Sequence, residues 1–95
     1  MDEITKETRR LSYDAMLPKR AARCRLVLAT LGDRELTVSE ITDELVRAGT
    51  LKYFNRNFVA PRMTDLKDMG LVRSVGRRPA THSDATEAVW ARVPG

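Results

Sequence analysis

The chain of 95 residues contains a single cysteine, Cys24, and a single histidine, His82. One cysteine excludes an internal disulfide and a cysteine-based metal site, and one histidine excludes a histidine metal cluster within one chain. The sequence also lacks a nucleotide-binding glycine loop and the HExxH, CxxC and nucleophile-elbow motifs. We therefore expect no enzymatic activity, no metal and no small-molecule cofactor.

Long apolar runs are missing as well. No segment approaches the roughly 20 apolar residues of a membrane helix, and the opening MDEITKETRR has no apolar core of a signal peptide. The apolar spacing around Cys24 predicts a small buried side chain there rather than a nucleophile. These features predict a cytoplasmic protein that does not associate with a membrane.

The charges are grouped along the chain. Lysine and arginine number 17 against 13 aspartates and glutamates, a net charge of +4. Basic residues dominate segments 17–36, 50–62 and 71–82, whereas segment 37–49 is net acidic. Blocks of positive charge are typical of proteins that bind polyanions, although such blocks can also be ordinary solvated faces.

Two helices are predicted in the first half of the chain. From Pro18, which suits the first turn of a helix, apolar residues recur at helical spacing up to the stop at residues 32–33. This first stripe consists of Leu17, Ala21, Cys24, Val27, Leu28 and Leu31. Residues 35–36 could form a very short strand. Thr37 and Glu40 then match a capping box, which predicts a second helix that buries Ile41, Leu45 and Val46 and stops at Gly49.

A third helix is predicted over about residues 57–69, after a connector at 50–56. Val59, Met63 and Leu66 form its apolar stripe, and Gly70 suits the residue that ends it. Because a helix tolerates proline only in its first turn, Pro61 predicts a start no earlier than about Asn57. In the connector, residues 53–54 (Tyr-Phe) are expected to cover the edge of the core, with a ligand contact as the alternative.

The last part of the chain predicts a β-hairpin. Residues 71–75 and 87–93 have strand-like patterns, and Gly76 to Pro79 are expected to break the first strand and begin a long basic turn. His82 would lie in that turn as a solvated residue. The predicted fold is α+β, mainly α: a winged helix-turn-helix with a three-helix core and a C-terminal hairpin wing over residues 17–95, preceded by a short arm or helix at 1–16.

Four strings along this order resemble a known family. They are LT-x-x-EI-x-x-x-L from Leu36, N-x-VAPRM-x-x-L-x-x-x-GLV from Asn57, GRR from Gly76 and AVW from Ala88. Over about residues 19–93 the chain is similar to small winged helix-turn-helix proteins of phage and prophage origin, in which Tyr13 of the arm also has counterparts. The resemblance implies binding of double-stranded DNA and a role in transcription or in the phage life cycle.

The predicted DNA contacts fall on the third helix, the connector and the wing. Asn57 and Thr64, which share a face with Pro61 opposite the apolar stripe, are the candidates for base edges. Backbone phosphates would be met by Lys52, Arg56 and Arg62, and the minor groove or its phosphates by Arg77 and Arg78. For Arg62 a salt bridge with Asp65 is the alternative.

Two further questions stay open from the sequence. A homodimer could pair through the arm at 1–16. The alternative function is a protein-interaction module, for example a phage-encoded modulator of a host protein, because a fold alone does not fix a function.

Overall fold

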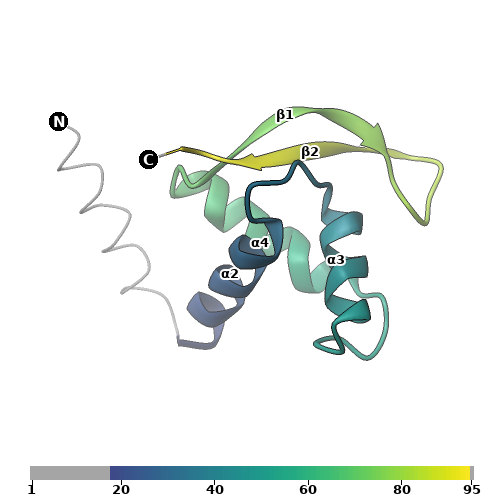
Figure 1. Ribbon diagram of the computed structural model, residues 1–95, viewed down its shortest axis with the longest axis horizontal. Helices are drawn as coiled ribbons and strands as arrows, with labels where there is room; N and C mark the ends of the chain where they lie inside the picture. The colour runs from purple at the N-terminus through teal and green to yellow at the C-terminus, as the bar shows by residue number, and fades with distance from the viewer. Residues whose placement is uncertain (1–17, 95) are drawn as a thin grey trace, which may run out of the picture.

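A computed structural model describes residues 18–94, so the predicted arm at 1–16, together with Leu17 and Gly95, lies outside the described residues. Over these described residues the fold is α+β, with three helices and a two-stranded antiparallel hairpin. The elements are α2 (Pro18–Leu31), α3 (Val38–Arg47), α4 (Arg56–Asp68), β1 (Val72–Pro79) and β2 (Thr86–Arg92). The hairpin lies over one side of the helices, with its turn on the α3 side (Figure 1).

The first helix packs as its spacing predicts. In α2 the side chains of Ala21, Cys24, Val27 and Leu31 are buried, and Leu28 is partly buried against the same core. Burial raises the pKa of the Cys24 thiol, whose Sγ lies 3.9 Å from an oxygen of Asp65. A thiol kept protonated and out of solvent is the inert buried residue that the sequence predicts.

Local hydrogen bonds fix the start of α3. The hydroxyl of Thr37 accepts from the Glu40 amide at 3.2 Å, and the Glu40 carboxylate accepts from the Thr37 amide at 2.8 Å. This reciprocal pair confirms the predicted capping box. One residue earlier, Leu36 forms an isolated antiparallel bridge with Trp90 of β2, which confirms the very short strand.

The third helix, α4, begins one residue earlier than predicted, because Asn55 caps it by accepting from the amide of Asn57. Pro61 therefore lies inside the helix. Since proline has no amide hydrogen, the carbonyl of Asn57 loses its helical partner. The predicted stripe is confirmed: Val59, Met63 and Leu66 are at most 1% exposed. Gly70 adopts φ of 74°, the left-handed conformation expected after the helix end.

The hairpin differs from the prediction at Gly76, because β1 continues to Pro79 and the turn occupies residues 80–85. Pairing with β2 outweighs the local turn tendency of glycine and proline. The register runs from Val72 opposite Arg92 to Ser74 opposite Trp90, then resumes at Gly76 opposite Val89. Val75 is thus an extra residue, a β-bulge, and its side chain is 40% exposed.

None of the helices between residues 18 and 94 is long and apolar enough to cross a membrane.

Candidate nucleic-acid interface

One face of α4 is open to solvent. Asn57, Pro61 and Thr64 are exposed on it, as predicted, while the opposite stripe enters the core. Lys52 of the connector is also exposed. The helix therefore offers two exposed polar side chains, Asn57 and Thr64, on one face, and the segment that leads into it carries an exposed lysine.

Arg62 does not belong to this open face. Its side chain is 17% exposed, and its Nε lies 2.9 Å from Oδ2 of Asp65, although the N–H is not aligned for a hydrogen bond. Arg20 of α2 binds both oxygens of the same carboxylate, with its Nε donating to Oδ2 at 3.0 Å. The structure thus favours the salt-bridge alternative for Arg62 over a backbone contact, and this three-residue cluster joins α2 to α4.

Asp65 is the centre of that cluster and is 8% exposed. Hydrogen bonds from Arg20 lower its pKa below the usual range, against the opposite effect of burial. A carboxylate this well paired stays ionised at neutral pH, so the cluster is a charged link within the helical core.

Arg56 has a partner that the sequence analysis did not identify. Its Nε donates to Oε1 of Glu87 at 2.5 Å, and Oε2 of Glu87 accepts from the backbone amide of Ser39 at 3.2 Å. Burial raises the pKa of Glu87, but the hydrogen bonds from Arg56 and Ser39 outweigh it, and the net pKa lies below its usual value. Glu87 lies two residues before the buried Val89 on the same strand, so the alternation of side chains along a strand places Glu87 on the buried face. This alternation is the only sequence signal that indicated the burial of Glu87.

The two neighbouring arginines of β1, Arg77 and Arg78, have different surroundings. Arg77 is exposed, with one contact of 3.3 Å to the Thr86 hydroxyl. The Nη1 of Arg78 instead donates to both oxygens of Glu40, at 2.6 and 2.7 Å. The expectation that both side chains are free in solvent is therefore wrong for Arg78, because the acidic segment around α3 lies under the hairpin.

This difference predicts unequal losses of stability for two single substitutions. Arg78→Ala should lower the free energy of unfolding by about 1 kcal/mol, since it removes a charge-assisted hydrogen bond at a partly exposed site. Arg77→Ala should change it by less than about 0.5 kcal/mol. Urea denaturation of both variants measures the two values. Equal losses would show that the ion pair with Glu40 does not form in solution.

The turn of the hairpin is attached to α3. His82 Nε2 lies 2.8 Å from Oδ1 of Asp43, and the Thr81 hydroxyl donates to Oδ2 of Asp43 at 2.9 Å. The His82 ring also meets Phe54 edge-on at 4.4 Å between centroids. His82 is thus a docked residue, not simply a solvated one.

Tyr53 corrects another expectation. It is 68% exposed, so it does not cover the core, whereas Phe54 is half-buried and contacts the His82 ring. Of the alternatives for this pair, a ligand contact is therefore the one that remains for Tyr53.

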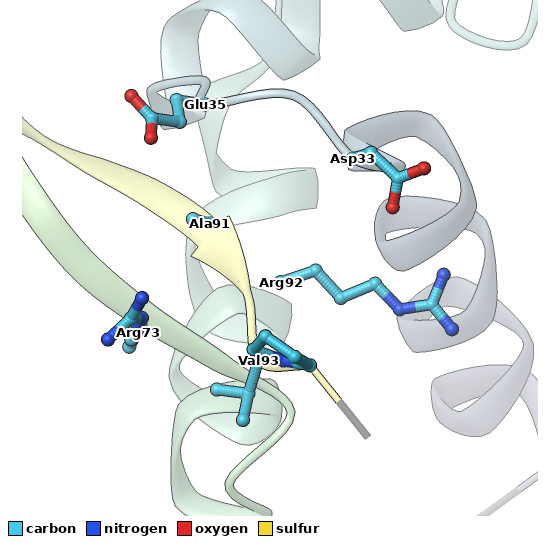
Figure 2. A pocket seen from close by; sticks show the side chains of 7 residues that line it. Asp33, Glu35, Arg73, Ala91, Arg92 and Val93 are labelled. Carbon is cyan, nitrogen blue, oxygen red and sulfur yellow. The ribbon is translucent and has the colours of Figure 1, made fainter.

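A separate hollow of about 460 Å³ lies at the open end of the hairpin. In Figure 2 Arg92 extends toward the end of α2, where Asp33 lies, while Arg73 and Glu35 lie on other sides of the space. Its rim carries both acidic and basic side chains, and groups of like charge are not gathered on one side of it. This hollow therefore selects no class of ligand.

Comparison of the chain with protein-family models, with curated proteins and with solved structures finds no match.

Proposed function

We propose that this protein is a winged helix-turn-helix protein that binds double-stranded DNA, with α4 in the major groove and the hairpin as the wing. The observation that carries the proposal is the division of α4 into two faces. Val59, Met63 and Leu66 are buried, whereas Asn57 and Thr64 are exposed on the other side of the same helix. A helix anchored in this way can enter a groove without giving up its core contacts.

The order of elements supports the winged-helix part of the proposal. Three helices are followed by an antiparallel hairpin, and the bridge between Leu36 and Trp90 adds a third short strand to that hairpin. The connector between α3 and α4 places Lys52 near the start of the recognition helix, and the wing adds the exposed Arg77.

In this proposal Asn57 and Thr64 read base edges, with Pro61 between them on the same face. Lys52 and Arg56 meet backbone phosphates, and Arg77 meets the minor groove or its phosphates. Arg62 and Arg78 hold the binding surface in place through Asp65 and Glu40. A role in transcription or in a phage life cycle comes from the sequence resemblance, and the cytoplasmic location comes from the composition of the sequence. Two copies would pair through the arm at 1–16.

The test is the salt dependence of binding to a labelled duplex of mixed sequence, followed by fluorescence anisotropy. If four to six phosphates are neutralised, log K should fall against log salt with a slope of roughly −4 to −5. We expect a slope of about −4, the shallower limit of this range, because several arginines of the basic segments form ion pairs within the chain. These are Arg20, Arg34, Arg56, Arg62 and Arg78. Affinity should then fall by roughly two orders of magnitude between about 50 and 200 mM salt.

A protein-interaction module is the second candidate, and the exposure of Tyr53 favours it, because aromatic residues are enriched at protein interfaces. Weak duplex binding without salt dependence would reject the DNA proposal and leave this candidate. Arg77→Ala is the internal control: it should make the slope shallower by about 0.9 without changing thermal stability.

A further inference from the structure

A narrow groove of about 190 Å³ separates the exposed face of α4 from β2. Arg56, Ala60 and Thr64 border it on the helix side, and Glu87, Ala88 and Trp90 on the strand side. The two alanines leave room for a ligand group, and Arg56 at its N-terminal end is the cation on its rim.

Glu87 fixes the orientation of that cation. Its side chain is 8% exposed, and both of its oxygens are used, one by Nε of Arg56 and one by the Ser39 amide. Arg56 is bound through Nε, and its side chain is 49% exposed. Within residues 18–94 neither terminal nitrogen of Arg56 donates a hydrogen bond to a partner, so both are available to a ligand.

A guanidinium held in this way suits one chemistry. Its two terminal nitrogens form a planar fork that matches phosphate oxygens. Arg56 also occupies the first turn of α4, where the helix dipole favours a negative group. Because an ammonium group has no such fork, a lysine could not bind Glu87 and a phosphate with separate nitrogens.

We propose that the groove between α4 and β2 binds one phosphate of the DNA backbone through Arg56, and that Glu87 is the positioning residue that aims Arg56 at it. This inference rests on the proposed DNA binding and adds to it a site between the recognition helix and the wing. It also gives a buried acid a role in holding a polyanion.

The test compares affinities for the same labelled duplex across a salt series. Arg56→Ala should weaken binding about five- to tenfold at low salt and make the slope shallower by about 0.9. Glu87→Gln distinguishes positioning from net charge, because the loss of a negative charge would by itself make the protein bind DNA more tightly. We expect it to weaken binding by about threefold or more, since the guanidinium loses its fixed orientation.

Three more variants separate positioning from the effect of charge alone. Arg56→Lys keeps the charge at a half-exposed site, and it should bind almost as weakly as Arg56→Ala. Arg73→Ala removes an equal charge at the open end of the hairpin, beside the hollow of Figure 2, and should weaken binding less than about twofold. The double variant Glu87→Gln with Arg56→Ala should bind no more weakly than Arg56→Ala alone.

The outcomes are distinct. Tighter binding by Glu87→Gln, or wild-type affinity in Arg56→Lys, would overturn the positioning role while leaving DNA binding intact. If Arg56→Ala behaves like Arg73→Ala, the groove holds no phosphate. Failure of the wild-type protein to bind duplex DNA in a salt-dependent way would reject the proposed function itself.

Discussion

Asp65→Asn should lower the free energy of unfolding by about 3 kcal/mol. The carboxylate is 8% exposed and is the shared partner of Arg20 and Arg62. Without its charge Arg62, which is only 17% exposed, would remain as an uncompensated cation inside the α2–α4 contact. The value lies at the lower end of the range for buried ion pairs because Arg20 is half exposed and can turn to solvent.

Urea denaturation at neutral pH measures this effect, and Asp68→Asn is the matched control. Asp68 is exposed on the same helix, so the same change of group there should cost less than about 0.5 kcal/mol. Similar losses in both variants would contradict the cluster.

The effect should also depend on pH. Because the pKa of Asp65 in the folded protein is depressed, its contribution to stability is present above the unfolded pKa of about 3.9 and is lost as the pH falls through the folded value. The difference between wild type and Asp65→Asn should therefore shrink below about pH 4. A constant difference down to strongly acidic pH would show that the charge of Asp65 is not what stabilises the fold.

Leu66→Ala should cost about 2–5 kcal/mol, because Leu66 is fully buried and its removal leaves a cavity where α4 meets the core. Asn57→Ala and Thr64→Ala, on the exposed face of the same helix, should change stability by less than about 0.5 kcal/mol. Thermal or urea denaturation of the three variants tests the orientation of α4.

Binding-site selection on the same variants tests recognition. A base contact by Asn57 or Thr64 would contribute about 1–3 kcal/mol of discrimination, so its loss should flatten the preference at one position and leave non-specific affinity nearly unchanged. Intact base preference in both variants would move the specificity residues to the connector, where Lys52 and Tyr53 are exposed.

Features that depend on neighbours in sequence could be predicted. The capping box at Thr37 and Glu40, the helix end at Gly70 and the buried stripe from Val59 to Leu66 all follow from spacings of three or four residues, and the structure confirms each. The exposure of Asn57 and Thr64 follows from the same helical period.

Features that depend on residues far apart in the sequence could not be predicted. Arg56 and Glu87 are 31 residues apart in sequence, and Arg78 and Glu40 are 38 apart, so no local pattern distinguishes these arginines from free ones. At Gly76 the local signal was misleading, because pairing with Val89 of β2 keeps the chain extended where its composition favours a turn.

The extra residue in β1, Val75, determines which side of the hairpin Arg77 and Arg78 occupy. Side chains alternate along a strand, and residues directly opposite each other in a hairpin share a face. With Val75 left out of the pairing, Arg78 lies opposite the buried Glu87, and Arg77 lies opposite Ala88. Had Val75 paired with Val89, every later position would move by one, so that Arg77 would point toward α3 and Arg78 toward solvent. The extra residue Val75 therefore determines that Arg78 forms the ion pair that holds the hairpin against α3, and that Arg77 stays exposed to solvent.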